Sequence, residues 1–321
     1  MLVQLVPTYD EKYTHQTELS SVTEEEFNAN IKPSKATVVD RLIQLVFFFV
    51  FFGWLRLLLI IFFSLVYVIL MSPVLITPNP TVIKIMTAPG IALTRLYFRV
   101  VYFLLGIYYI KREGEIDPKA RCFLFNHQTV LDGPMIYIYK PFIVIGMAEL
   151  KRTPVAGPIL TAAKSLFVDR SKNEGIAKVI TDYLNEPQEV PMALSPEGRT
   201  TKGKFLLQFR TGSFIAKAPI QPVTIRYKVF LPFGKTGVVW LVGGMKEWLI
   251  RMLCMPGAMV EMHFLPLLDN DEFYNKSPAE KALYCNLLMA NDLGVKASDR
   301  STRDMFKKGD KKKDEKKQKE E

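Results

Sequence analysis

A histidine and an aspartate five residues apart are the pair of side chains in this sequence best suited to acid–base chemistry. His127 and Asp132 stand in the segment Asn-His-Gln-Thr-Val-Leu-Asp. A carboxylate that holds one imidazole nitrogen leaves the other nitrogen free to accept a proton from a hydroxyl. The alternative is structural, with Asp132 as a helix cap and His127 as an ordinary loop histidine. Taken alone, the pair allows both interpretations.

The spacing of the two residues predicts where each one lies. Five residues on one α-helix are rotated about 140° apart, so the pair cannot share a helical face. The apolar run 122–125 predicts a buried strand before the pair, and Gly133 and Pro134 suit the first turn of a helix after it. We therefore expect Asp132 at a helix start and His127 in the preceding loop, at a strand end, where α/β domains place their chemistry.

Charged residues follow two further apolar runs. Arg170 ends one of them, and a guanidinium matches the geometry of a phosphate. Glu197, Gly198 and Arg199 follow another; the two charged side chains could bind a polyol phosphate, and the glycine permits close backbone approach. The alternatives are a surface salt bridge at Arg170 and an ordinary turn at 195–200.

The elements that must position these residues alternate in the chain as short apolar runs and helical or loop stretches. This spacing predicts an α/β fold in which a mixed β-sheet is flanked by helices. The candidate strands are Cys122–Phe125, Phe142–Ile145, Leu166–Val168, Met192–Leu194, Pro222–Tyr227, Val238–Val242 and Val260–Leu265. A helix is expected over Ala279–Leu293.

A long apolar stretch from Leu42 to Met71 precedes this region. As one helix it would be roughly 45 Å long, against a hydrocarbon core of about 30 Å. We expect a membrane helical hairpin of two half-membrane helices, broken near Gly53 and Arg56 and stopped by Pro73, with both ends on the same side. A single span is the alternative.

A second apolar stretch, Ile91–Ile110, carries Arg95 and Arg99 one helical turn apart. The shared face of the two arginines suits a helix lying in the membrane interface. An amphipathic helix packed on the catalytic domain fits equally well.

Composition narrows the class of partner. The chain has 321 residues, is 49% hydrophobic with 22 Phe, and carries a formal net charge of +10. Such a chain suits membrane lipids and anionic headgroups or phosphates, and its hydrophobicity argues against nucleic acid. The three cysteines show no metal-binding or disulfide spacing, which indicates a reducing compartment and no metal site.

We expect five segments along the chain. Residues 1–36 are polar and form a flexible N-terminal arm, and residues 37–112 form the membrane-embedded and interfacial helical region. Residues 113–268 form the α/β domain and 269–303 a helical appendage. The nearly wholly charged residues 304–321 form a disordered tail.

These residues, taken in order, resemble the HxxxxD glycerophospholipid acyltransferases. The resemblance is carried by an ordered set: His127 with Asp132, Phe167-Val168-Asp169-Arg170, Pro196-Glu197-Gly198 and Gln221-Pro222-Val223. The later part of the chain, including Val260–Pro266 and Asn286–Gly294, is closest to the lysophosphatidylcholine acyltransferase branch. Lys164 and Arg199 depart from the family's usual glycine and threonine, which leaves the acceptor open.

The resemblance implies a glycerol-3-phosphate acyltransferase-like fold and direct acyl transfer. His127, oriented by Asp132, would deprotonate a lysophospholipid hydroxyl that attacks acyl-CoA, which is a co-substrate; no cofactor or metal is implied. Arg170, Glu197, Gly198 and Arg199 would bind the acceptor. Lys202 and Lys204 would meet the CoA phosphates, or else are solvated surface lysines.

The expected location is a membrane of the endoplasmic reticulum or a lipid droplet, with the catalytic domain facing the cytosol. Two alternatives stay open. One is a lysophosphatidate or glycerol-3-phosphate acyltransferase, and the other is a scaffold that keeps the fold without catalysis. The intact His127 and Asp132 favour the enzyme.

Overall fold

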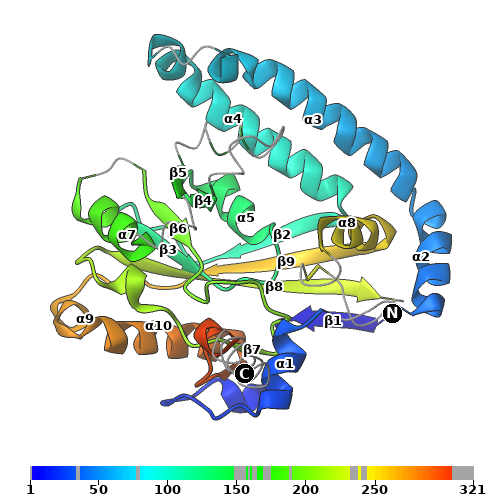
Figure 1. The fold of residues 1–321 in the computed structure, drawn as a ribbon. Helices are drawn as coiled ribbons and strands as arrows, with labels where there is room; N and C mark the ends of the chain where they lie inside the picture. Colours follow the sequence, from blue (N-terminus) through cyan, green and yellow to red (C-terminus); the bar gives the residue numbers. More distant parts are fainter. Residues whose placement is uncertain are drawn as a thin grey trace, which may run out of the picture.

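The computed structural model describes residues 2–33, 37–76, 80–147, 157, 160, 165–168, 175–187, 190–231, 238–239 and 244–305. Their main feature is a six-stranded mixed sheet with the order β2-β9-β8-β3-β6, to which β1 adds by pairing with β8 (Figure 1). The strands of this sheet are β1 (Leu2–Val6), β2 (Ile107–Glu113), β3 (Cys122–Phe125), β6 (Met192–Leu194), β8 (Ile220–Leu231) and β9 (Gly257–Phe264).

Strand β3 lies at the centre and runs parallel to both β6 and β8. All four of its residues are buried, because successive side chains point to opposite faces and helices cover both. Phe123 and Phe125 belong to one apolar core, and Cys122 and Leu124 belong to another. The mixed sheet flanked by helices is therefore confirmed.

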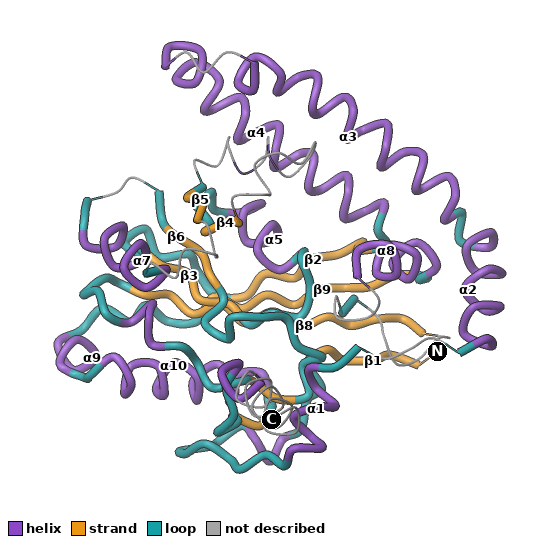
Figure 2. The backbone as a smooth tube through the Cα atoms, in the orientation of Figure 1, coloured by secondary structure: helices purple, strands orange, loops and turns teal. Residues whose placement is uncertain are grey.

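The first core lies between the sheet and the helices α3 (Gly53–Ile76), α4 (Pro80–Leu104), α5 (Asp132–Tyr139) and α8 (Gly244–Cys254). The second core lies under α7 (Ile176–Asn185) and α10 (Pro278–Leu293). Figure 2 shows the strands between these two groups of helices. The remaining elements are η1 (Glu11–Tyr13), α1 (Glu24–Ile31), α2 (Val38–Val50), β4 (Ile145–Met147), β5 (Leu166–Val168), β7 (Phe205–Leu206), η3 (Thr211–Phe214), α9 (Asp271–Asn275), β10 (Lys296–Ala297) and η4 (Thr302–Met305).

The predicted strands match the structure best where they are short and apolar. β3, β5 and β6 have the predicted bounds, and β8 includes and extends its prediction. β9 begins earlier than predicted, at Gly257, and ends at Phe264, so the predicted Leu265 lies outside it. The strand expected at 142–145 begins only at Ile145, although Ile143 forms an isolated bridge with Met192. Val238 and Val239 are in no strand, and the rest of that predicted strand lies outside the described residues.

The expectation of a flexible arm over residues 1–36 is wrong for most of its length. Leu2–Val6 pairs with the end of β8, and α1 begins with a capping box between Thr23 and Glu26. Phe27 and Ile31, one helical turn apart, are buried against Phe205 and Leu207. Glu24, Glu25 and Glu26 form the first turn of this helix, where carboxylates are favourable.

The structure contains a helical hairpin, but its two helices are not the pair that we expected. The break falls at Phe51 and Phe52, close to the predicted position, and Phe52 has a φ of 54°. However, α3 continues as one helix through Pro73 instead of ending there. Its partner is α4, which runs antiparallel to it (Figure 1). Two hydrogen bonds of 2.9 Å join the helices: Ser64 on α3 to Tyr97 on α4, and Tyr67 on α3 to Thr94 on α4.

Only one helix in the described residues is long and apolar enough to cross a membrane, the stretch Gly53–Pro73. The helix α4 packs on the α/β domain, which was one of the two expectations for Ile91–Ile110. Arg95 donates to the carbonyls of Tyr137 and Tyr139 at the end of α5. The helix ends at Leu104, and the last part of the predicted helix is strand β2.

We predict that Asn30 on α1 stabilises the fold by joining the N-terminal segment to the 202–205 loop. Its side chain is fully buried, donates to the Phe205 carbonyl and accepts from the Lys204 N–H. Asn30→Ala would leave both backbone groups unpaired and cost about 2 kcal/mol or more. Thermal unfolding in detergent should show a lower Tm, whereas the half-buried neighbour Asn28 should tolerate alanine; equal effects would contradict the prediction.

Candidate active site

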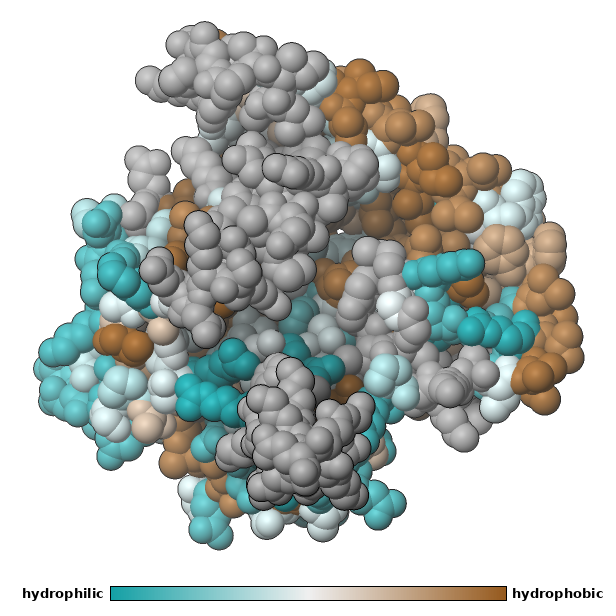
Figure 3. All heavy atoms as spheres, in the orientation of Figure 1, coloured by the Kyte–Doolittle hydropathy of each residue, from teal (hydrophilic) through white to brown (hydrophobic). Residues whose placement is uncertain are grey.

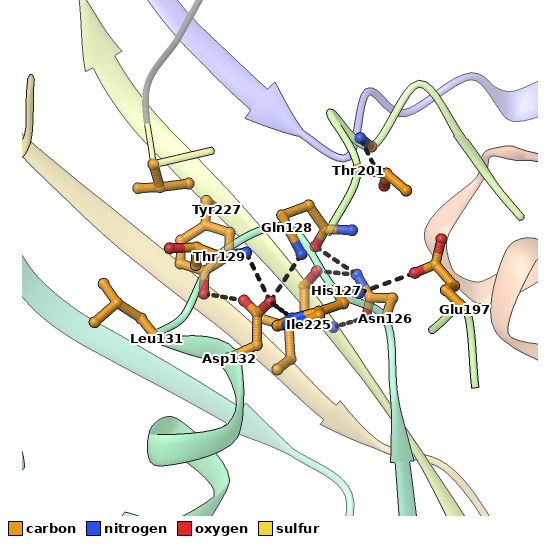
Figure 4. A network of polar contacts seen from close by, with 12 residues as sticks. Asn126, His127, Gln128, Thr129, Leu131, Asp132, Glu197, Thr201, Ile225 and Tyr227 are labelled. Atoms are coloured by element: carbon orange, nitrogen blue, oxygen red, sulfur yellow. Dashed lines mark hydrogen bonds and ion pairs between the residues drawn. The ribbon is translucent and has the colours of Figure 1, made fainter. Parts of the chain in front are cut away.

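His127 and Asp132 are in contact, in the arrangement expected from their spacing. The Nδ1 atom of His127 lies 2.8 Å from Oδ2 of Asp132. Asp132 is the first residue of α5, and His127 lies in the loop that follows β3 (Figure 4). The imidazole is 26% exposed and the carboxylate is fully buried. No described residue bonds Nε2, so that nitrogen is available to a hydroxyl.

The Asp132 carboxylate is held in place by four donors. Its Oδ2 accepts from His127 and from the backbone N–H groups of Gln128 and Thr129, at 2.8 and 2.9 Å. Its Oδ1 accepts from the hydroxyl of Tyr227 on β8. These bonds fix the carboxylate in one orientation, and its contact with Nδ1 in turn orients the imidazole.

The 195–201 loop holds the backbone of His127 from both sides. The Glu197 carboxylate accepts the His127 N–H at 2.9 Å, and the Thr201 N–H donates to the His127 carbonyl at 2.8 Å. The second oxygen of Glu197 accepts the N–H of Leu207 at 3.2 Å. Figure 4 shows Glu197 and Thr201 near the histidine, each on a different segment of the 195–201 loop. These bonds fix the point from which the imidazole projects.

Asn126 ties the same loop to strand β8. Its amide donates to the Ile225 carbonyl at 2.8 Å and its Oδ1 accepts the Ile225 N–H at 2.7 Å, so the side chain continues the β3–β8 ladder beyond the end of β3. The amide also donates to the side chain of Gln128. The loop that carries His127 is therefore bonded to β8 and to the 195–201 loop.

Glu197 differs from its predicted role as an acceptor-binding residue. Its side chain is fully buried, and each oxygen accepts a backbone N–H. Burial raises the pKa of Glu197 to about 7, although the two backbone donors oppose that shift. We assign Glu197 to positioning His127, because a buried carboxylate bound on both oxygens cannot reach a substrate.

The neighbouring residues of the same loop are more accessible. Gly198 is exposed with a φ of +76°, and a Cβ there would lie 2.8 Å from Nε of Arg210, so only glycine fits without displacing that arginine. Arg199 is half-buried and donates to the carbonyl of Ile31 on α1, at 3.3 Å. Burial lowers the pKa of Arg199. Its binding role stays a prediction.

The three remaining residues predicted to bind substrate are Lys202, Lys204 and Arg170. The backbone of Lys202 donates to the carbonyl of Asn30, and burial, followed by the charge of Lys204, lowers the pKa of its amine. Lys204 is exposed next to it. Contact with CoA phosphates stays a prediction for both lysines. Arg170 lies outside the described residues.

Four residues of the site were not predicted: Asn126, Thr201, Tyr227 and Asn30. Tyr227 lies on a predicted strand, but only the pairing of β8 with β3 brings its hydroxyl to Asp132. Asn126 had one local signal, a polar side chain directly at the end of a fully apolar strand. Helix α4 also reaches the loop, because the Tyr102 hydroxyl donates to the Leu131 carbonyl at 2.9 Å.

A second His–Asp pair lies on the opposite face of the sheet. Nδ1 of His263 on β9 lies 2.7 Å from Oδ1 of Asp292 on α10, and Thr224 donates to the other oxygen of Asp292. Thr224 and Tyr227 are three residues apart on β8, so they point to opposite faces. The two pairs share their local geometry and differ in surroundings.

The fold and the His–Asp pair are those expected of an HxxxxD acyltransferase domain, and the chain is similar to known acyltransferases. Residues 113–226 match the protein-family model for Acyltransferase. Within the described residues, no group of three or more His, Cys, Asp or Glu side chains could hold a metal ion.

The chain is also similar to curated lysophospholipid acyltransferases. Human lysophosphatidylcholine acyltransferase 1 is 28% identical over 214 residues, which cover 64% of this chain and 40% of the relative. The human lysophospholipid acyltransferase LPCAT4 is 29% identical over 214 residues, covering 63% and 39%, and LPEAT2 of Arabidopsis thaliana is 26% identical over 221 residues, covering 67% and 40%. The chain spans about two fifths of the length of these relatives.

One solved structure shares the fold. The crystal structure of the 1-acyl-sn-glycerophosphate acyltransferase PlsC from Thermotoga maritima aligns with a TM-score of 0.50 over 74% of this chain and 96% of that chain. The sequence identity is 14%, so this likeness concerns the fold alone. The predicted glycerol-3-phosphate acyltransferase-like fold is confirmed.

The raised pKa of Glu197 predicts a specific dependence of stability on pH. A carboxyl group whose pKa rises from 4.5 to about 7 on folding contributes stability below 4.5 that is lost as the pH rises toward 7. Glu197→Gln removes this titration and adds a cost independent of pH. The Tm difference between the wild type and Glu197→Gln should therefore shrink between pH 5 and 7.5.

The control for this experiment is Glu25→Gln, which changes an exposed carboxylate on α1. Its Tm should follow that of the wild type across the range. A Tm difference for Glu197→Gln that stays constant with pH would contradict the shifted pKa.

Proposed function

We propose that this protein is a membrane-bound acyltransferase that moves a fatty acyl group from acyl-CoA to a hydroxyl of a lysophospholipid. The observation that carries the proposal is the His127–Asp132 pair at 2.8 Å, with a buried carboxylate and a partly exposed imidazole. The similarity to lysophospholipid acyltransferases supports the acceptor class. Neither a metal nor a prosthetic group takes part in the proposed reaction.

The proposed chemistry is direct transfer with His127 as general base. Nε2 takes the proton of the acceptor hydroxyl as its oxygen forms the new ester bond with the thioester carbon. The C–S bond then breaks, and the imidazolium returns the proton to the departing thiolate of CoA. Asp132 orients the ring and stabilises the imidazolium, and His127 therefore acts first as the base and then as the acid.

The clamp on the His127 backbone supports this chemistry. General-base catalysis requires the nitrogen to lie within hydrogen-bond reach of the hydroxyl, and small misplacements are costly. Glu197 and Thr201 hold the peptide groups on either side of the ring, so the base is positioned before the substrate arrives. In the proposal, Arg170, Gly198 and Arg199 contact the phosphate and glycerol of the acceptor.

The helices α3 and α4 support a location at a membrane. Helix α3 contains the long apolar stretch, and α4 contacts the site directly through Tyr102 and Leu131. A substrate with an acyl chain would thus meet the base close to the lipid phase. We propose a cytosol-facing membrane of the endoplasmic reticulum or a lipid droplet, where acyl-CoA is accessible.

The test is release of CoA from acyl-CoA with a panel of lysophospholipids, lysophosphatidate and glycerol 3-phosphate. We expect His127→Ala to lower kcat by about 10²–10⁴-fold, the range for loss of a general base. Asp132→Asn should also lower kcat, because the imidazole loses its orienting anion.

His263→Ala provides a matched control, because it breaks a His–Asp pair of the same geometry on the other face of the sheet. Its activity should stay within about twofold of the wild type. Equal activity of wild type and His127→Ala would rule out the mechanism, and inactivity with every acceptor would favour a scaffold. The acceptor with the highest kcat/KM would identify the subclass.

A further inference from the structure

Helix α2 presents its apolar residues outward. None of its thirteen residues is buried. The side chains exposed by more than half follow helical spacing along one stripe: Val38, Val39, Leu42, Leu45, Val46, Phe49 and Val50. The half-buried residues are Ile43, Gln44, Phe47 and Phe48, and Arg41 reaches helix α8. A helix that leaves so long an apolar stripe uncovered indicates a further apolar partner.

Arg41 joins the inward face of α2 to helix α8. Its Nη1 and Nη2 lie 2.9 and 2.6 Å from the two oxygens of Glu247, a bidentate pair. The Glu247 side chain is only 11% exposed. Parallel bonds between a guanidinium and a carboxylate fix orientation as well as distance. The pair therefore sets how α2 lies along α8.

Arg56 binds the other end of α8. Its guanidinium is buried and donates to the carbonyls of Met252, Leu253 and Met255, each at 3.2 Å, and to that of Leu104 at the end of α4 at 2.5 Å. The last carbonyls of a helix have no partners within it, and a cation there is favourable. The two arginines thus hold the α2–α3 bend against both ends of α8.

The apolar stripe of α2 continues onto α3. The outer residues of α3, among them Leu58, Phe62, Leu65 and Ile69, are 57%, 57%, 59% and 67% exposed. Figure 3 shows hydrophobic atoms running along α3 and down α2 on one edge of the molecule. Helix α3 is long and apolar enough to cross a membrane. Since the apolar stripe of α2 is continuous with that of α3, the same lipid phase can cover both helices.

We infer that α2 lies on the surface of a lipid bilayer with its apolar stripe in the hydrocarbon boundary, and that Arg41 and Arg56 fix the orientation of the catalytic domain on that bilayer. The inference rests on the proposed function, which supplies the membrane. It adds which helix determines how the catalytic domain lies on that membrane. In this arrangement Arg41 and Arg56 are positioning residues. They contact no substrate. Their effect is on the distance of His127 from the lipid surface and on the angle at which the domain faces it.

The first experiment measures the depth of α2. The full chain carries a single spin label at Leu45→Cys or Phe49→Cys and is reconstituted in bilayers of phosphatidylcholine and phosphatidylserine. The native Cys122, Cys254 and Cys285 are buried. The control is Lys178→Cys on α7, a largely exposed lysine.

We expect the α2 labels to be more accessible to oxygen than to a water-soluble nickel chelate, and the Lys178→Cys label to show the reverse order. Equal accessibility at all three positions would overturn the inference. So would strong dipolar coupling between α2 labels, which would mean that a second copy covers the stripe. This readout does not depend on catalysis, so it can fail or succeed separately from the proposed acyl transfer.

The second experiment separates orientation from chemistry. Arg41→Gln should lower the rate with a long-chain lysophospholipid in vesicles by about tenfold, and leave the rate with a short-chain, monomeric lysophospholipid within about twofold. Arg41→Lys should restore part of the vesicle rate. Lys228→Gln, which breaks the partly exposed Lys228–Glu261 pair, is the matched control and should leave both rates unchanged. Equal losses on both acceptors, or no loss on vesicles, would overturn the inference.

Discussion

The buried carboxylate of Glu197 is the interaction on which the rest of the site depends. It accepts one N–H from His127 and one from Leu207, and so joins the loop after β3 to the segment that leaves β7. Removing a carboxylate from water is costly, and burial raises its pKa to about 7. The two N–H donors oppose that rise in pKa. The position of one of them is also set by α10, where Asn286 donates to the Leu207 carbonyl.

The two carboxylates of the site have different tasks because their surroundings differ. Asp132 meets an imidazole, two backbone donors and a phenol, and therefore acts on a side chain. Glu197 meets only backbone donors and acts on the main chain. One aligns the ring and the other aligns the peptide that carries it. The proposed base is thereby defined in both orientation and position without using a residue that also binds substrate.

How much of this was predictable depended on how far apart in sequence the partners lie. The contact between His127 and Asp132 followed from a local spacing, and β3, β5 and β6 followed from short apolar runs. The role of Glu197 could not be predicted in this way. A charged residue in a turn is expected to be solvent-exposed or to bind substrate, and only the fold shows that this one is buried. Tyr227 and Asn30 lie about 100 and 170 residues in sequence from their partners Asp132 and Lys204. The apolar stretch 42–71 also contains no sign that α4, and not α2, would be the main partner of α3.

The order of the strands has a consequence for how the chain is made. β2 lies at the end of the helical region, yet its neighbour β9 begins at Gly257, and β1 at the N-terminus pairs with the end of β8. Both early strands must therefore wait, unpaired, while the ribosome adds most of the catalytic domain. The apolar helices α3 and α4 are complete long before that point, so the order of synthesis favours their reaching a lipid phase first and the sheet closing afterwards beside it.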